Sequence, residues 1–249
     1  MYGIFIGATY ERALSMQQAD QPRIARIAGA ALLLICASAL FSNDLIVPGD
    51  AVATAHNVVT HETRFRVGIF GELLMLNGDI MLAIALYLLL RPVNAGLALI
   101  GTIWRLANAM LLAVGVATSL VAIDAVTDKH YLEAFQSAQM ATAMRQLLDF
   151  HGTAMSLGLV FFGLGAGVHS YLFWQSRYIP RVLSGAYLLV TSALFLTCSA
   201  MIVFPAMERV ADPWVVAPDF FVELAVALWL LIKGVRVEQS QSDMDSRFQ

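Results

Sequence analysis

The sequence has few charged residues for its length of 249. Charged side chains make up only 13% of it, whereas 59% of the residues are hydrophobic. Soluble globular proteins carry about 25% charged residues, so this chain has about half the usual share. The mean hydropathy is +0.72. The shortage of charge excludes a soluble enzyme and a disordered chain, and it indicates a membrane protein.

Basic residues and cysteines are also scarce. Fifteen Lys and Arg against eighteen Asp and Glu give a net charge of −3, which leaves no basic surplus to hold nucleic acid. The two cysteines, Cys36 and Cys198, lie in separate apolar segments and form no CxxC motif. We expect both to be packing residues, and we expect no cofactor. Residues of zinc-ligand type that could converge at the outer face match no zinc-site spacing: His56, His61, Glu62, Asp149 and His151.

Long apolar runs, in contrast, are abundant. A transmembrane helix needs about 20 mostly apolar residues. Six such segments follow one another at 26–47, 67–90, 93–123, 147–174, 181–204 and 214–236. The predicted fold is therefore all-α, a polytopic bundle of six transmembrane helices within residues 26–236. An N-terminal tail (1–25) without signal-peptide features and a polar, disordered C-terminal tail (237–249) are expected to flank it.

The basic residues predict the orientation of the bundle. With the N-terminus inside, the cytoplasmic ends carry Arg12, Arg23, Arg26, Arg91, Arg177, Arg181, Lys233, Arg236 and Arg247. The outside ends carry Arg64, Arg66, Lys129, Arg145 and Arg209. Because Lys and Arg collect on the cytoplasmic side, both termini are predicted to be cytoplasmic. The expected location is the inner membrane of a bacterium.

A glycine-rich string, Gly-Leu-Gly-Ala-Gly at 163–167, lies inside the fourth predicted span. It follows no strand, so it is not a nucleotide-binding motif. Gly163 and Gly167 form a small-xxx-small pair, which predicts close approach of a neighbouring helix.

Four ionisable side chains fall well inside the predicted spans: Glu72, Asp79, Arg105 and Glu223. Each would cost about 2.5–3.5 kcal/mol at a lipid-exposed helix centre, so we expect them to face the interior and to be paired. Glu72 and Asp79 are seven residues apart and share one helix face. At 1.5 Å per residue, Arg105 lies about 18 Å from the cytoplasmic side, near the depth of Asp79, and Glu223 lies about 13 Å below the outer surface.

These depths predict a polar crevice that opens to the outside, with Arg105 at its floor. The amides of Asn77 and Asn108 lie at similar depths. The mouth of the crevice is predicted to comprise Asn43, Asp44, Asp149 and His151. Three carboxylates against one arginine leave an excess of negative charge, which such a site normally balances with a proton or a cation. The same charges can instead serve as ion pairs that fix helix register.

Several strings resemble a known family. They are Ala-Leu-Tyr-Leu-Leu-Leu-Arg at 85–91, Trp-Arg-Leu-Ala-Asn-Ala at 104–109, Phe-Phe-Gly-Leu-Gly at 161–165, Ser-Arg-Tyr-Ile-Pro-Arg at 176–181 and Glu-Leu-Ala-Val-Ala-Leu-Trp-Leu-Leu-Ile-Lys-Gly at 223–234. Together they are similar to the bacterial six-helix membrane proteins of domain-of-unknown-function family 4386, over about residues 23–235. The resemblance implies the fold but no activity, and it singles out Arg105 and Glu223 as motif positions. The family often has an acidic residue where this chain has Asn108.

Three kinds of function remain open. The first is binding or passage of a small solute, proton or ion through the crevice lined by Glu72, Asp79, Arg105 and Glu223. The second is a non-catalytic accessory or structural subunit, as a homo-oligomer or within a larger membrane complex. An intramembrane enzyme is third, because the sequence contains no Ser-His-Asp, HExxH or paired-acid motif for hydrolysis. The expected partners are membrane lipid and a small solute or ion.

The orientation can be tested with reporter fusions. A reporter fused after Gln249 is expected to be active only in the cytoplasm, and one inserted near Lys129 only outside, because the basic residues gather at the cytoplasmic helix ends. Activity of the Lys129 fusion in the cytoplasm would show that the predicted orientation is wrong and that the crevice opens toward the cytoplasm.

Overall fold

The computed structural model describes residues 2–41, 50–127, 137–204 and 208–235, and apart from short turns these are helical. The elements in chain order are α1 (Tyr2–Ser38), η1 (Ala39–Phe41), α2 (Ala51–Thr60), α3 (Glu62–Leu90), α4 (Ala95–Thr127), α6 (Ser137–Ser176), α7 (Arg181–Val203) and α8 (Glu208–Ile232). No strand occurs among the described residues. The prediction of an all-α fold is confirmed.

Five stretches of helix are long and apolar enough to cross a membrane. They are Asp20–Phe41, Glu62–Leu90, Ala95–Thr127, Gln139–Ser176 and Arg181–Val203. They correspond to the first five predicted spans and indicate a multi-pass membrane protein. Helix α8 corresponds to the sixth predicted span, and its crossing of the membrane stays a prediction.

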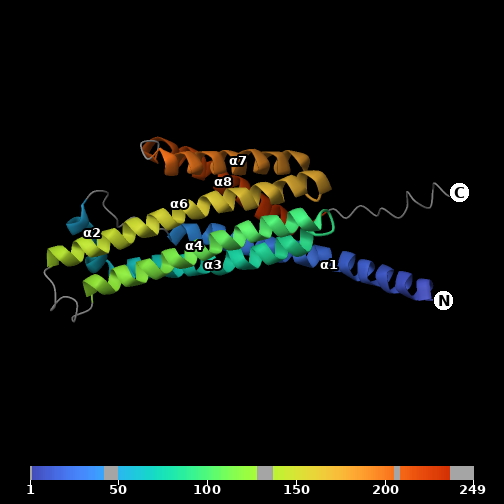
Figure 1. Cartoon of the computed structure of the whole chain (residues 1–249), viewed down its shortest axis with the longest axis horizontal. Coiled ribbons are helices and arrows are strands. Elements are labelled where there is room, and N and C mark those ends of the chain that lie inside the picture. The colour runs from blue at the N-terminus through green and yellow to red at the C-terminus, as the bar shows by residue number, and fades with distance from the viewer. Residues whose placement is uncertain (1, 42–49, 128–136, 205–207, 236–249) are drawn as a thin grey trace.

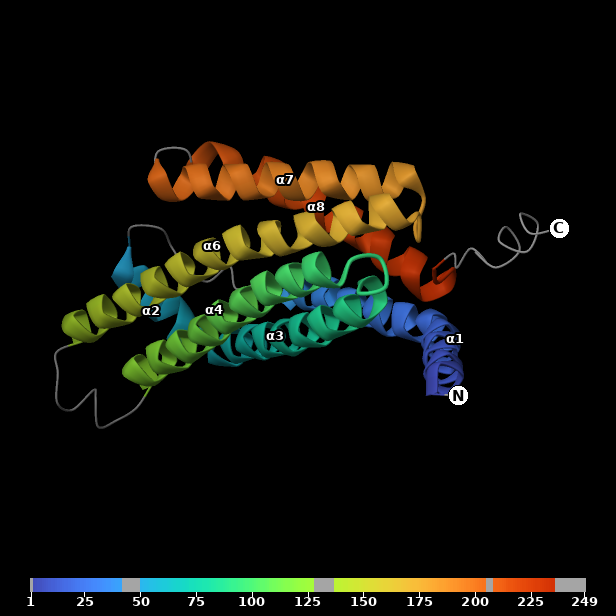
Figure 2. The same ribbon diagram turned by 45° about the vertical axis from the view of Figure 1, so that its right-hand side comes forward.

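The six long helices form a closed ring in chain order. Helix α1 packs against α3, α3 against α4, α4 against α6, α6 against α7 and α7 against α8, and α8 returns to α1. Figures 1 and 2 show α6 running between α7 and α8 on one side and α3 and α4 on the other. Neighbours in sequence are neighbours in space because short connections join antiparallel helices. The ring therefore has an interior to which helices far apart in the sequence contribute side chains.

Exposed apolar side chains cover the outside of the ring. On α4 the large ones run from Leu99 to Val121, and on α7 from Val182 to Val203. Each stretch rises about 32–33 Å at 1.5 Å per residue. This height is close to the roughly 30 Å thickness of the hydrocarbon core of a bilayer. The outer surface thus has the size and chemistry of a lipid-facing belt.

Glycines allow close backbone contact at two junctions of the ring. A Cβ added at Gly29 of α1 would lie 2.6 Å from the backbone nitrogen of Leu231 on α8. A Cβ added at Gly165 of α6 would lie 2.9 Å from the carbonyl oxygen of Gly101 on α4. Small residues at helix contacts of this kind are typical of membrane bundles. They help to close the ring at α1–α8 and to bring α4 and α6 together.

The helices extend beyond the predicted spans. Residues 2–25, expected as a tail, continue α1 without a break, since Ala, Leu, Met and Gln favour helix. The expected loops at 48–66 and 124–146 contain α2 and the ends of α3, α4 and α6. The Asp50 carboxylate caps α2 by accepting from the Ala53 backbone nitrogen at 2.8 Å. A search for long apolar runs misses such helices. The predicted C-terminal tail lies outside the described residues.

The predicted small-residue contact in α6 is present. A Cβ added at Gly163 would lie 2.9 Å from Cβ of Phe195 on α7, and one at Gly167 would lie 4.0 Å from Oγ1 of Thr191. Gly163→Leu is therefore expected to force α6 and α7 apart and to lower the melting temperature in detergent, because overpacking costs about 1–3 kcal/mol.

Gly152→Leu in the same helix is the matched control, because nothing lies within 4 Å of an added Cβ at Gly152. Thermal unfolding of both variants measures the effect. Equal melting temperatures for Gly163→Leu and the control would show that the Gly163 contact does not hold α6 against α7.

Candidate functional site

A buried ion pair joins α3 and α4 inside the ring. Arg105 is 0% exposed and Asp79 is 2% exposed. Nε of Arg105 donates to Oδ1 of Asp79 at 2.8 Å, and Nη2 lies 2.7 Å from the same oxygen. Nδ2 of Asn108 donates to Oδ2 of Asp79 at 2.8 Å. Both carboxylate oxygens are thus engaged, as a buried charge requires. The pairing agrees with the depths of Asp79 and Arg105 expected from the sequence.

Helix α6 closes over this ion pair. The guanidinium carbon of Arg105 lies 4.9 Å from the centroid of the Phe162 ring, which is a cation–π distance. A Cβ added at Gly165 would lie 3.1 Å from Cγ of Arg105. Because Gly165 has no side chain, the aliphatic part of the Arg105 side chain fits against α6. Helices α3, α4 and α6 enclose the charge together.

Two further carboxyl groups, Asp219 and Glu223 of α8, are buried in the ring; we call them the carboxyl pair. They are 7% and 5% exposed. The hydroxyl of Tyr187 on α7 donates to Oε1 of Glu223 at 3.1 Å. Oδ1 of Asp219 has no hydrogen-bond partner among the described residues. Both carboxyl groups interact electrostatically with Arg105. Glu223 therefore shares the interior with Arg105, while Asp79 holds the arginine directly.

A pocket of about 180 Å³ lies between α3, α4, α6 and the end of α1. We call it the rim pocket. It is lined by Ser38, Ala39, Phe41, Phe65, Gly68, Glu72, Met75, Ser119, Leu148, His151 and Met155. Ser119 lies within one turn of Val121, the last large exposed apolar residue described on α4. The pocket is therefore near the edge of the apolar belt, at the end where α3 begins and α4 ends.

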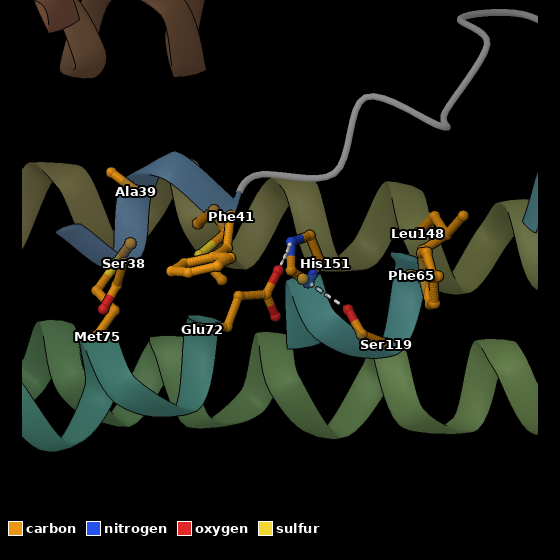
Figure 3. Close-up of a pocket in the computed structure, with 11 residues that line it drawn as sticks. Ser38, Ala39, Phe41, Phe65, Glu72, Met75, Ser119, Leu148 and His151 are labelled. Carbon is orange, nitrogen blue, oxygen red and sulfur yellow. Dashed lines mark hydrogen bonds and ion pairs between the residues drawn. The ribbon is translucent and has the colours of Figure 1, made fainter. Parts of the chain in front are cut away.

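Three polar side chains meet in the rim pocket. Nε2 of His151 lies 3.5 Å from Oε1 of Glu72. Nδ1 of His151 lies 3.0 Å from Oγ of Ser119 and 3.0 Å from the carbonyl oxygen of Gly115. Figure 3 shows His151 between Glu72 and Ser119. Oε2 of Glu72 is buried and has no hydrogen-bond partner among the described residues. His151 thus lies beside one carboxylate oxygen of Glu72, while the other oxygen is buried without a partner among the described residues.

Serine, histidine and glutamate are also the residue types of a hydrolytic triad. Ser119 lies in the interior of α4, however. Backbone N–H groups inside a helix donate to carbonyls one turn earlier, so those around Ser119 are not free to stabilise an oxyanion. This geometry favours binding over hydrolysis.

The structure divides the residues of the predicted crevice between two places. Arg105, Asp79 and Asn108 form the ion pair and its amide partner, and none of them lines the rim pocket. Glu72 lines that pocket together with His151, which was predicted only for the mouth. Seven residues of helix separate Glu72 from Asp79 by about 10 Å, so one face of α3 serves both places.

The remaining predicted residues lie elsewhere. Asn77 is exposed and donates to the Leu73 carbonyl of its own helix. Two residues turn a helix by about 200°, so Asn77 faces away when Asp79 faces inward. Asp149 is exposed and pairs with Arg145 at 2.8 Å. The predicted mouth residues Asn43 and Asp44 lie outside the described residues.

Sequence reasoning missed three polar residues of these sites, Ser119, Tyr187 and Asp219. Ser119 is a small hydroxyl residue in an apolar helix, where serine gives no signal of a site. Asp219 precedes Glu223 by one helical turn, and that spacing was a usable signal. It was overlooked because Asp219 is close to the predicted outer end of its span.

Comparison with known proteins gives a family match. The profile of a family described as "Domain of unknown function (DUF4386)" matches residues 27–234, which include the ion pair, the carboxyl pair and the whole lining of the rim pocket. An uncharacterized protein of Archaeoglobus fulgidus is 28% identical over 174 residues, which are 70% of this chain and 85% of that protein. No solved structure matches the chain significantly.

Proposed function

Because the chain belongs to the DUF4386 family, whose description names no activity, we propose a function from the rim pocket. The chain is a membrane protein that binds a small organic cation with an apolar body. The observation that carries this proposal is the Glu72 carboxylate. Its Oε2 is buried, faces no hydrogen-bond partner among the described residues and belongs to a mostly apolar lining. An ammonium group is a ligand that satisfies such an oxygen.

The lining of the rim pocket suits the apolar part of that ligand. Phe41, Phe65 and Leu148 provide apolar surface, and Met75 and Met155 provide adaptable thioethers. Binding sites commonly combine such a lining with a few polar groups that fix orientation. The volume of about 180 Å³ lies below the range of drug-sized ligands, which is roughly 300–1,000 Å³. The ligand is therefore small.

The proposal includes six membrane spans with both termini in the cytoplasm. The packing of α8 between α7 and α1, which closes the ring, supports α8 as the sixth span. The orientation is supported by four basic residues that lie at the helix ends opposite the rim pocket, Arg91, Arg177, Arg181 and Lys233. The positive-inside rule assigns that end to the cytoplasm. The pocket then opens to the outside of the cytoplasmic membrane, which is the inner membrane in a bacterium.

Passage of the cation across the membrane is a second step of the proposal. The interior beyond the pocket is filled by large, fully buried side chains, Arg105 and Tyr187 among them. A solute cannot pass while Arg105 is held on Asp79 under Phe162. Binding at the rim is therefore the first event, and passage requires the ion pair to separate.

An accessory subunit remains the alternative, and one observation favours it. Four apolar residues of α7 recur every seven positions and are highly exposed: Val182, Leu189, Leu196 and Val203. Such spacing is typical of a helix–helix seam. Lipid covers an apolar face equally well, so this seam supports an accessory subunit less strongly than the rim pocket supports ligand binding.

The binding proposal is tested with benzylamine, a small aromatic cation, and benzyl alcohol, its neutral analogue of similar size. Benzylamine is expected to raise the melting temperature of the purified protein in detergent, and benzyl alcohol is not, because only the amine satisfies Glu72. A ligand at a hundred times its Kd stabilises by about 2.7 kcal/mol. The comparison with benzyl alcohol removes the effect of partition into detergent.

Glu72→Gln is expected to abolish the difference between the two compounds. Glu62→Gln on the same helix is the matched control, because Glu62 is half-exposed and paired with Arg66 at 2.7 Å. Equal shifts from both compounds in the wild type, or an undiminished amine effect in Glu72→Gln, would contradict the proposal.

A further inference from the structure

The carboxyl pair of α8 has no part in the rim pocket. Asp219 and Glu223 are four residues apart, and both are more than nine-tenths buried. Residues at this spacing lie on one helix face with their Cβ atoms about 5–6 Å apart. Two negative charges at that separation repel, and in the interior of a membrane protein little water is present to screen them.

The groups around the carboxyl pair come from the other helices of the ring. Tyr187 of α7 bonds to Glu223. Cys36 of α1 and Arg105 of α4 interact electrostatically with both carboxyl groups, and Asp79 of α3 interacts with Glu223. Of these four neighbours, Arg105 alone carries a positive charge.

Arg105 is already matched by Asp79. The two oxygens of Asp79 accept from Arg105 and from Asn108, which is the pattern of an ionised carboxylate. One positive charge and one negative charge therefore cancel at the ion pair. Full ionisation of Asp219 and Glu223 would leave two further negative charges without a cation.

We propose that the carboxyl pair holds at least one exchangeable proton, which makes Asp219 and Glu223 a proton-binding site inside the ring. The unpartnered Oδ1 of Asp219 and the unpartnered Nη1 of Arg105, both buried, show that the hydrogen bonding of this region is incomplete among the described residues. A proton removes one charge without needing a cavity, whereas a metal cation needs several oxygen ligands around it. The proton relieves the repulsion between two carboxyl groups that cannot favourably both be charged.

Release of this proton has a consequence for the ion pair. It adds a negative charge within electrostatic range of Arg105, whose Nη1 donates to no acceptor among the described residues. The carboxyl pair then competes with Asp79 for the guanidinium. Release of the proton from α8 is therefore expected to weaken the ion pair that ties α4 to α3.

Infrared spectroscopy of the full-length protein tests the site at neutral pH. Exposed carboxyl groups are ionised at this pH, so a carbonyl band of protonated carboxyl reports buried groups. The wild type is expected to show such a band, and the band is expected to shift in D₂O because the proton exchanges. It is also expected to shift when Asp or Glu carboxyl carbons are labelled with ¹³C. Absence of the band in the wild type would overturn the proposal.

Variants identify the carboxyl groups that hold the proton. Asp219→Asn and Glu223→Gln are each expected to weaken or shift the band, while Asp149→Asn, at an exposed ion pair, leaves it unchanged. Persistence of the unaltered band in both α8 variants, or its loss in Glu72→Gln, would contradict the assignment. Should neither α8 variant fold, Tyr187→Phe is decisive. It removes one hydrogen bond to Glu223 and is expected to shift the band, and an unshifted band overturns the proposal.

Discussion

The ion pair between Arg105 and Asp79 constrains the rest of the structure. A guanidinium that is completely buried in a lipid-facing bundle must meet a carboxylate, because an uncompensated buried charge costs about 3–5 kcal/mol. The pairing fixes the height of α4 relative to α3. Asn108 donates a hydrogen bond to the second carboxylate oxygen of Asp79. Gly165 and Phe162 allow α6 to pack over the charge. Three of the six long helices are thereby held in one register.

The buried polar groups differ in how fully they are satisfied, and this difference separates structural roles from functional ones. Asp79 has donors on both oxygens and serves the fold. Glu72 has one oxygen held by His151 and one without a partner, and Asp219 has an oxygen without a partner among the described residues. Natural proteins rarely bury such groups unsatisfied. Glu72 at the rim and Asp219 in the interior are therefore where ligands are expected, a cation at the first and a proton at the second.

Apolar runs and helix rise were sufficient to predict the spans and the depth of the charges. They located five apolar helices and brought Arg105 to the height of Asp79, because 1.5 Å per residue converts sequence position into depth. Depth does not say which way a side chain faces. Asn77 was placed with Asp79 although two residues turn it to the opposite side, and Glu72 was assigned to the cluster of Arg105 although it lies about two turns away.

The order of helices around the ring was the other missing information. Nothing in the sequence said that α8 returns to α1, or that α4 and α6 pack closely enough to bring Ser119 beside His151. The helix α2 and the helical residues 2–25 were missed because they are too short or too polar to read as spans. The sequence pattern thus determined heights and lengths, while the lateral neighbours of each polar group required the tertiary structure.

The most direct measurement of the central claim is a double-mutant cycle on Arg105 and Asp79, read as the free energy of unfolding in detergent. Arg105→Leu alone is expected to lose about 3–5 kcal/mol, because it leaves Asp79 buried without its cation. Adding Asp79→Leu is expected to restore most of that loss, and adding Glu223→Leu much less. If the losses at Arg105 and Asp79 simply add, the two residues are not energetically coupled, and the ion pair does not hold the ring together.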